Sequence, residues 1–393
     1  MVSIRSIIVS VFSSSIRLID LFIPKRKNQF LFSGPQFKGN TRYLFEHLVS
    51  DVNLEYRDFN LYWLTRSLDE TKYINSKFNK VFAYNILSLK GIFIFLRSKY
   101  LFLTHGASDY FYFIGKHNPK KFIINLWHGT PIKKMDKLVP NSKIQWNLMT
   151  SGSKYESLSY KSISNIDFSK IIISGHPRTQ YLYDSNLNIE LKKEIQLNIL
   201  KTANLNFHQI ILYAPTYRKH VPTKLFPFND FNITDLQNHL AKFNILLIIK
   251  MHPYEKILHK SSFEFNLVTY KTKNMIVVDD DISSSMEDFL LISDLLITDY
   301  SSSFFDFLIL KKPTFFIPYD YEEYKNFYGF SLDYINLISN QFAETYQDFI
   351  KLIETNLKSP EAFQKDILLN LSKYHQYNPS KVYDTIMKEV IEN

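Results

Sequence analysis

A histidine stands directly after a run of apolar residues in the segment FIINLWHGTPIKKM, residues 122–135. This histidine is His128, and a neutral imidazole near pH 7 is suited to take a proton from a hydroxyl group. Gly129 would let a ligand approach the backbone, Thr130 follows it, and Lys133 would add positive charge nearby. We therefore predict a catalytic base at His128. The alternative is a buried histidine that bonds only to the backbone.

Six predicted strands end in polar residues that can bind a ligand or titrate. The residues that follow these strands are His128–Thr130, Gly175–Arg178, Ala214–Arg218, Met251–Pro253, Asp299–Ser303 and Tyr319–Tyr321. In open parallel sheets, ligands bind beyond the carboxyl ends of the strands. The six strand ends therefore predict one cleft that is lined from both halves of the chain.

Two arginines and a lysine–histidine pair have the chemistry to bind phosphate. Arg218 ends the segment YAPTYR, which also contains Thr216, and a guanidinium group is the preferred fork for phosphate oxygens. The alternative for Arg218 is an ion pair between domains. Arg178 in GHPR has the same chemistry. Lys250 and His252, two residues apart at a strand end, would clamp a phosphate or pyrophosphate; the alternative is a salt-bridged lysine before a turn.

The segment TDYSSSFFDFLIL predicts a strand that ends at Thr298 and a helix that the serines open. Ser303 and Asp306 have the spacing of a capping box. A helix start with free N–H groups and hydroxyls is also an anion site, and Asp299 could bond a ribose or an acceptor hydroxyl. The candidates in this segment are Thr298, Asp299, Ser301, Ser302, Ser303 and Asp306.

The composition narrows the classes of function. The chain has 393 residues, no cysteine and a formal net charge of +9, which favours acidic partners, although basic residues also serve solubility. Without cysteine, thiolate metal sites are excluded. The sequence has no GxGxxG, P-loop or HExxH motif and no metal-spaced histidine–carboxylate cluster. We therefore predict no metal and no cofactor, and the aromatic residues do not form a nucleic-acid-binding signature.

Short apolar runs that alternate with helical stretches predict an α/β fold with parallel sheets. The expected strands are 29–33, 61–65, 80–84, 99–104, 121–127 and 170–174, then 209–213, 244–250, 275–278, 294–298 and 313–317. A helix is expected over 187–203, between the two sets. The expected division is a surface segment (1–27), a first Rossmann-like domain (28–190), a second one (191–372) and a C-terminal helix that crosses back (373–393).

The N-terminal segment 1–27 has the pattern of a helix at a membrane surface. Arg5 and Arg17 bracket only eleven uncharged residues, too few for a bilayer span. Apolar residues recur at helical spacing up to Phe12, and the basic cluster Lys25–Lys27 follows. We predict an interfacial amphipathic helix followed by a basic patch. The alternative is an ordinary helix packed on the domain.

Six motifs resemble, in their order along the chain, the CDP-glycerol:poly(glycerophosphate) glycerophosphotransferase family, the teichoic-acid primases and polymerases. They are LWHGTPIKKM, GHPR, ILYAPTYR, KMHP, ITDYSSSFFDFLILKKPTFFIPYD and EEYKNFYGF, and FLFSGPQFKGNTRYLFEHL resembles the family's first strand and helix. The resemblance covers about residues 28–372. It implies two Rossmann-like domains of glycosyltransferase-B type with an interdomain cleft, the first for the acceptor and the second for the CDP donor.

The resemblance also implies a reaction. It implies transfer of glycerol phosphate or ribitol phosphate from a CDP-alditol to a hydroxyl of an undecaprenyl-linked cell-surface glycan, with release of CMP. It implies a peripheral protein on the cytoplasmic face of the bacterial membrane, at an anionic surface. His128 is implied as the catalytic base and His252 as a second essential histidine. The residues implied around the donor are Arg218, Lys250, Thr298, Asp299, Ser301 and Ser302; further candidates are Gly129, Thr130, Lys133, Arg178, Thr216, Ser303 and Asp306.

Some questions stay open in the sequence. His176 stands where the family more commonly has asparagine, in GNPR, so its role is open. One rival function is a nucleotide-sugar-dependent glycosyltransferase of the same fold, in capsule or surface polysaccharide synthesis, which fits the strand ends equally. Another is a non-catalytic membrane- or polyanion-binding protein with structural histidines. A titration with nucleotides distinguishes this second rival, because a non-catalytic binding protein should show no preference for CDP compounds.

Overall fold

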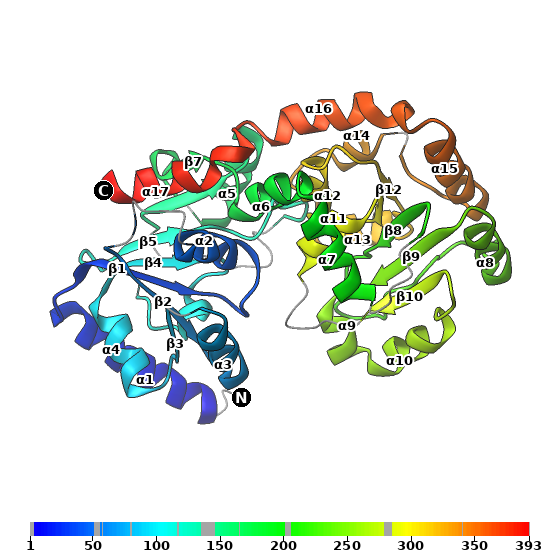
Figure 1. Cartoon of the computed structure of the whole chain (residues 1–393). Coiled ribbons are helices and arrows are strands. Elements are labelled where there is room, and N and C mark those ends of the chain that lie inside the picture. The colour runs from blue at the N-terminus through cyan, green and yellow to red at the C-terminus, as the bar shows by residue number, and fades with distance from the viewer. Residues whose placement is uncertain are drawn as a thin grey trace. The chain divides into compact units, whose positions relative to one another are not determined.

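The computed structural model describes residues 4–50, 56, 58–78, 81–115, 118–134, 146–164, 166–200, 206–278, 285–339 and 341–392. The chain forms two compact units. The first unit comprises Met1–His128, Leu138–Tyr181 and Gln376–Asn393, and the second comprises Gly129–Lys137 and Leu182–His375. Each unit contains one parallel sheet with helices packed around it (Figure 1).

The first unit is built on a seven-stranded parallel sheet with the order β3-β2-β1-β4-β5-β6-β7. The strands are β1 (Arg26–Ser33), β2 (Asn60–Thr65), β3 (Phe82–Asn85), β4 (Ser98–Leu103), β5 (Phe122–Asn125), β6 (Leu148–Ser151) and β7 (Ile171–Ile173). The order reverses between β1 and β4. Such a reversal is the point at which open parallel sheets bind ligands.

Helices cover both faces of the first sheet, and for this reason consecutive residues from Gln29 to Ser33 in β1 are all buried. The helical elements are α1 (Ile4–Phe22), α2 (Gly39–Val49), α3 (Leu68–Lys77), α4 (Leu89–Arg97), η2 (Ala107–Tyr110), α5 (Lys154–Ser164), η3 (Phe168–Lys170), the start of α6 (Pro177–Asn186), η5 (Pro379–Lys381) and α17 (Val382–Glu392). Ser67 and Ser88 cap α3 and α4 with their hydroxyls. Ile386 and Met387 of α17 are buried in the core of this unit, so the end of the chain completes it.

The second unit has a five-stranded parallel sheet with the order β10-β9-β8-β11-β12. The strands are β8 (Gln209–Tyr213), β9 (Ile245–Lys250), β10 (Met275–Val278), β11 (Leu295–Thr298) and β12 (Thr314–Phe316). The order reverses between β8 and β11, so the loops after these two strands meet at the ligand-binding position of the sheet. All residues of β8, β9 and β11 are buried, as expected for strands that are covered on both faces.

Helices of the second unit surround this sheet. They are the end of α6, then α7 (Ile189–Leu200), α8 (Ile233–Lys242), α9 (Pro253–Leu258), α10 (Lys260–Thr269), α11 (Met286–Ile292), α12 (Ser303–Leu308), α13 (Tyr321–Phe327), α14 (Tyr334–Ile338), α15 (Tyr346–Lys358) and α16 (Gln364–Tyr374). Capping boxes start α11 at Ser285 and Asp288, and α15 at Thr345 and Asp348. The local sequence therefore fixes where these helices begin.

The predicted fold class, α/β with two Rossmann-like parallel sheets, is confirmed, and every predicted strand is present. The sequence missed β6, because Leu148 and Met149 are its only strongly apolar residues and two short polar residues complete it. The two units divide after Tyr181, whereas the sequence placed the boundary at 190/191. The helix expected over 187–203 is α7 of the second unit, and the segment 373–393 contains the end of α16 and all of α17.

Helix α1 packs on the first unit through one face and exposes apolar residues on another. Ser13 and Asp20 are buried, whereas Ile8 and Val11 are each 62% exposed and Phe22 is 74% exposed. Within the part of the chain that the structure describes, we find no helix with the length and apolar character needed to cross a membrane. The helix is thus packed on the first unit and also presents an apolar surface. Its predicted place at a membrane surface stays a prediction.

Candidate active site

The turn that carries His128 follows β5 and has an unusual backbone conformation. Trp127 has a φ of 54°, in the left-handed region, and Gly129 has a φ of 125°. The Nδ2 atom of Asn40 in α2 donates to the carbonyl oxygens of Leu126 and Trp127 at 3.0 and 2.8 Å. A non-glycine residue in this region costs on the order of 1–3 kcal/mol and is found preferentially at functional sites. The hydrogen bonds from Asn40 therefore hold the turn in a backbone conformation that a residue such as Trp127 disfavours.

The ring of His128 stacks on two other rings. Its centroid lies 4.4 Å from that of Trp127 with an interplanar angle of 20°, and 4.6 Å from that of His105 with an angle of 21°. His105 follows β4, the neighbour of β5, so both histidines leave the same edge of the sheet. The Nη1 atom of Arg178, at the start of α6, donates to the carbonyl oxygen of His128 at 2.7 Å. The first unit thus brings the candidates His128 and Arg178 together.

The surroundings of His128 keep its ring neutral. Burial lowers the pKa of His128 well below its usual range, and the nearby groups His105, Arg178 and His176 lower it further. A general base must be deprotonated at the working pH before it can accept a proton. His128 is therefore in the form that a general base requires at neutral pH.

His176, whose role the sequence left open, is an internal structural residue. It is 3% exposed, and its Nε2 atom lies 3.0 Å from Oε1 of Glu156 in α5. Its Nδ1 atom lies 3.2 Å from both the hydroxyl of Thr150 in β6 and the carbonyl oxygen of Leu126. Burial alone would raise the pKa of Glu156, but His176 lowers it below its ordinary value. His176 therefore fastens the start of α6 to the ends of β5 and β6.

Arg218 is the centre of a buried ion cluster in the second unit. It follows β8 and is 4% exposed. Its Nε and Nη2 atoms donate to the two carboxylate oxygens of Asp320 at 2.7 and 2.8 Å, and Nη1 lies 2.9 Å from Oδ2 of Asp299. Its guanidinium carbon lies 5.2 and 5.1 Å from the ring centroids of Tyr300 and Tyr324. Burial would lower the pKa of Arg218, but Asp299 and Asp320 raise it, so the charge persists.

This ion cluster restricts what Arg218 can bind. Its Nη1 atom also donates to the carbonyl oxygen of Thr216 at 2.5 Å, so every nitrogen of the fork has a protein acceptor. A phosphate oxygen would have to displace a carboxylate to reach the guanidinium group. Asp299 accepts in turn from the backbone N–H groups of Thr216 and Tyr300, both at 2.7 Å. Arg218 and Asp299 therefore fix the loops after β8 and β11 at the reversal of the sheet.

Local hydrogen bonds arrange the serines after β11. The hydroxyl of Thr298 donates to a backbone carbonyl of the loop after β8 at 2.7 Å. The Oγ atom of Ser301 accepts from the N–H of Ser303 at 3.2 Å, and the two hydroxyls are 2.9 Å apart. The predicted capping box of Ser303 and Asp306 is wrong. Ser302 occupies the N-cap and makes no side-chain capping bond, so the buried Asp306 lies one position beyond the place of a capping-box acid.

Lys250 and His252 have different environments at the end of β9. Lys250 is 8% exposed, and its ammonium lies 5.3 Å from the ring centroid of Phe289. His252 is exposed and is the N-cap of α9, where its Nδ1 atom accepts from the N–H of Tyr254 at 3.2 Å. Its ring stacks on Tyr217 at 5.4 Å and on Tyr254 at 5.3 Å. The capping bond and the two tyrosine rings therefore hold the imidazole of His252 in place at the surface. The side chain of Lys250, in contrast, is buried.

The segment Gly129–Lys137 belongs to the second unit, although it follows His128 directly. Within this segment Thr130 is buried, and Lys133 forms an antiparallel bridge with Phe330 of the second unit. The chain therefore changes units immediately after His128, and Lys133 already pairs with the second unit. This connection links the two candidate regions covalently through four intervening residues.

Lys133 adds a titratable cation to the ion cluster. Its Nζ atom lies 4.7 Å from the ring centroid of Tyr328 and 5.5 Å from that of Tyr324. Burial lowers the pKa of Lys133 to about 8, while Asp299 raises it and Arg218 lowers it. Tyr324 also lies under Arg218, so Lys133 and Arg218 share one aromatic neighbour. Lys133 thus carries a charge that deprotonation near pH 8 removes.

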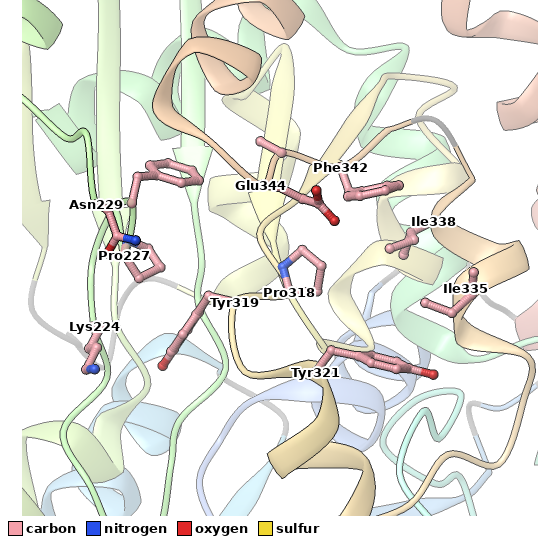
Figure 2. A pocket seen from close by; sticks show the side chains of 12 residues that line it. Lys224, Pro227, Asn229, Pro318, Tyr319, Tyr321, Ile335, Ile338, Phe342 and Glu344 are labelled. Atoms are coloured by element: carbon pink, nitrogen blue, oxygen red, sulfur yellow. The ribbon is translucent and has the colours of Figure 1, made fainter.

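A pocket of about 720 Å³ opens in the second unit beyond the carboxyl end of β12 (Figure 2). Its walls combine aromatic and polar side chains, among them Tyr319, Tyr321, Lys224, Asn229 and Glu344. Small-molecule sites typically measure about 300–1,000 Å³. The ring centroid of Tyr319 also lies 5.2 Å from the guanidinium carbon of Arg218, so this pocket adjoins the ion cluster.

The predicted site residues divide between the two units. The first unit holds His128 and Arg178. The second unit holds Gly129, Thr130, Lys133, Thr216, Arg218, Lys250, His252, Thr298, Asp299, Ser301, Ser302, Ser303 and Asp306. Lys133, Thr216, Arg218 and Asp299 form one cluster, whereas Lys250 and His252 lie at the end of β9. Each unit therefore contains a different subset of the predicted site residues.

Sequence reasoning missed two residues of these regions. His105 was indicated only by the similarity of FLTHG (102–106) to NLWHG (125–129). Asp320 follows a predicted strand, but nothing in the sequence shows that it pairs with Arg218, 102 positions away. Among the described residues, no group of three or more histidine, aspartate or glutamate side chains is arranged to hold a metal ion.

Comparison with known sequences identifies relatives along nearly the whole chain. The family model for CDP-Glycerol:Poly(glycerophosphate) glycerophosphotransferase matches residues 16–392. The teichoic acid poly(glycerol phosphate) polymerase of Bacillus spizizenii is 31% identical over 89% of this chain and 88% of its own. The teichoic acid glycerol-phosphate transferase of Staphylococcus aureus is 27% identical over 82% of each chain.

Solved structures show the same fold. The wall teichoic acid polymerase TagF superimposes with a TM-score of 0.76 at 21% identity, over 98% of this chain and 94% of its own. The UDP-GlcNAc 2-epimerase of Neisseria meningitidis superimposes with a TM-score of 0.59 at 11% identity, over 93% and 99% of the two chains. The two-sheet architecture is therefore shared with both of these proteins.

Proposed function

We propose a specific reaction for this chain, which belongs to the CDP-glycerol:poly(glycerophosphate) glycerophosphotransferase family. The chain is a transferase that uses CDP-glycerol, and the acceptor that we propose is a hydroxyl group of a lipid-linked cell-surface glycan. Relatives named for glycerol phosphate are up to 31% identical, whereas those named for ribitol phosphate reach 25%. This difference supports glycerol phosphate as the transferred group.

The reaction exchanges one phosphorus–oxygen bond for another. The acceptor oxygen attacks the β-phosphorus, and its proton passes to His128. The bond from the β-phosphorus to the bridging oxygen breaks, and CMP leaves with the electron pair. Phosphoryl transfer needs mainly positioning and charge stabilisation. The observation that carries this proposal is the neutral, stacked imidazole of His128 on its strained turn.

The second unit is the proposed donor site. Lys133 and Lys250 would neutralise the pyrophosphate, and His252 would be the second essential histidine. The loop after β11, with Thr298, Ser301 and Ser302, would contact the donor through hydroxyls and backbone N–H groups. Arg218 would act indirectly, because its fork already holds Asp299 and Asp320. The two lysine ammonium groups would neutralise the phosphates without a metal ion. A chelator should therefore leave turnover unchanged. Loss of turnover with a chelator would contradict the proposed absence of a metal.

A nucleotide assay tests the proposed reaction. Purified protein would be incubated with a lipid-linked glycan acceptor and, separately, with CDP-glycerol, CDP-ribitol and UDP-GlcNAc. We expect acceptor-dependent CMP release from CDP-glycerol and an acceptor mass that increases by glycerol phosphate. Release of UDP from UDP-GlcNAc, without CMP release from either CDP compound, would assign the protein to the nucleotide-sugar glycosyltransferases instead.

Donor binding should weaken as the pH rises through about 8, because Lys133 titrates there. Burial lowers the pKa of Lys133 to about 8, so its ammonium is charged below that pH and neutral above it. Affinity for CDP-glycerol, measured by calorimetry, should fall roughly tenfold between pH 8 and 9.5. The Lys133→Met variant should bind weakly at every pH and lack this drop. Wild-type affinity that stays constant across this range would remove Lys133 from the donor site.

We also propose that α1 attaches the protein to an anionic membrane at its cytoplasmic face. The exposed apolar residues Ile8, Val11 and Phe22 would enter the headgroup region, beside the exposed Arg26 and Lys27. Deleting the helix is a poor test. Buried Asp20 lies 2.7 Å from Lys25 and 3.3 Å from Lys121, so deletion would leave two ammonium groups without this partner.

Substitutions on the exposed face of α1 test membrane attachment cleanly. The double variant Ile8→Asp/Val11→Asp should lower binding to phosphatidylglycerol-containing vesicles at least roughly tenfold, because it replaces apolar surface by charge. Vesicle sedimentation measures this binding. Leu369→Asp is the matched control, since Leu369 is 64% exposed on α16 and should not affect it. Equal sedimentation of the double variant and the wild type would exclude this face of α1 from membrane attachment.

A further inference from the structure

We propose that His105 is a positioning residue for His128. The rings of His105 and Trp127 both stack on the His128 ring and would hold the edge that carries its nitrogen atoms in one direction. The inference rests on the proposed function, in which His128 takes the acceptor proton. His105 would touch neither the reacting phosphorus nor the leaving group, and its effect would pass entirely through His128.

Each of the two histidines follows a strand end and precedes a glycine with a positive φ. Strands β4 and β5 are parallel neighbours, with Leu103 paired to Asn125, and each strand is followed after a short interval by a His-Gly pair. The glycine after His105 has a φ of 122°, and the glycine after His128 has a φ of 125°. An L side chain rarely adopts this conformation, so both turns depend on glycine. The similarity of FLTHG to NLWHG therefore reflects a His-Gly pair after each strand with the glycine in the same backbone region, and the two imidazoles stack.

The ring contacts determine which faces of His128 are covered. Trp127 and His105 both lie nearly parallel to His128, at centroid distances of 4.4 and 4.6 Å. Two rings at these distances would crowd each other on one face, so we infer that they take opposite faces. The His128 ring is then free to interact only along its edge. A general base needs this restriction, since a misplacement of about 1 Å can slow a reaction by roughly a hundredfold.

His105 is itself held firmly. Buried Asp109 in η2 accepts from the backbone N–H groups of Thr104 and His105, both at 2.9 Å. The hydroxyl of Thr104 lies 2.8 Å from Nδ1 of His105 and fixes the plane of its ring. These contacts hold the His105 ring in a fixed orientation against the ring of His128.

His105 also opposes a positive charge on His128. A proton on either imidazole makes a proton on the other less favourable, because like charges so close repel. Consistent with this, burial first and His105 next lower the pKa of His128. Asp109 on η2, Arg178 on α6 and His176 before α6 act on the charge of this pair. Glu156 and Tyr160 on α5 contact His176 and Trp127 in turn. Without His105, His128 should bind a proton at a higher pH.

Two substitutions separate stacking from charge. His105→Ala removes the ring that stacks on His128, and we expect turnover at about pH 8 to fall roughly ten- to a hundredfold. His105→Phe keeps a flat ring, so turnover at about pH 8 should stay within roughly threefold of wild type, while the acidic limb of the rate profile moves toward neutral pH. His47→Phe is the matched control, because His47 of the same unit also stacks on a ring, that of Tyr383, at 4.2 Å. The control should retain the wild-type profile.

Turnover from pH 5.5 to 9, CDP-glycerol affinity and thermal unfolding would be measured for each variant. Wild-type turnover in His105→Ala, with an unmoved acidic limb in His105→Phe, would overturn the proposal. If His105→Ala fails to fold, His105→Phe decides alone, and an unmoved acidic limb then overturns it. Failure of the proposed function is recognised separately, by retained turnover in a variant that lacks the imidazole of His128.

Discussion

Replacing His128 by alanine should lower turnover by roughly 10²- to 10⁴-fold, the usual contribution of a general base. The neutral imidazole stands on a turn in which Trp127 has a φ of 54°, held by Asn40 from α2. The proposed donor residues belong to the second unit, so CDP-glycerol affinity should survive the substitution. Single-turnover CMP release and calorimetric donor binding would be measured on the same preparation.

The control for this variant is His47→Ala, which removes a stacked histidine of the same unit at another place. It should retain wild-type turnover. His128→Ala that binds donor normally and also turns over normally would show that another group takes the acceptor proton. The assignment of His128 would then be wrong, although the family membership of the chain would stand.

Replacing Arg218 by methionine should lower the free energy of unfolding by about 3–5 kcal/mol, the cost of removing one partner from a buried ion cluster. Asp299 is 2% exposed, and its carboxylate would lose the guanidinium partner at 2.9 Å. Asp320 would lose two hydrogen bonds, at 2.7 and 2.8 Å. Urea denaturation, followed by circular dichroism, measures the loss.

Lys358→Met is the matched control, since it breaks an exposed ion pair with Glu354 at 3.1 Å. Exposed pairs contribute about 0–1 kcal/mol, so this control should unfold close to the wild type. An Arg218→Met protein that unfolds like the wild type but no longer binds CDP-glycerol would contradict the structural role. Arg218 would then be the direct phosphate ligand that its sequence motif suggests.

The strand ends were predictable because their signal is local. An apolar run followed by polar residues identifies the carboxyl end of a buried strand, and parallel strands bring such ends to one edge of a sheet. For this reason the sequence located His128, Arg218 and Asp299 at strand ends. Strand β6 escaped because four residues with two polar ones give too little periodicity to recognise.

The pairing of residues distant in sequence was not predictable. Arg218 has the composition of a phosphate fork, but its carboxylate partners come from the ends of β11 and β12. His105 looks like an isolated histidine until β4 and β5 are known to be neighbours. The expected capping box required Ser303 to be the N-cap of α12, but the N-cap is Ser302. Such features depend on sheet order and exact helix starts, which composition does not encode.

The destination of the β-phosphorus of CDP-glycerol tests the account most directly. The donor would be labelled with phosphorus-32 at the β-position and incubated with the protein and a lipid-linked glycan acceptor. The account predicts that the label moves to the glycan and that the released CMP is unlabelled, because the bond broken joins the β-phosphorus to the bridging oxygen. Label that stays on a released CDP would contradict it, since glycerol alone would then have been transferred.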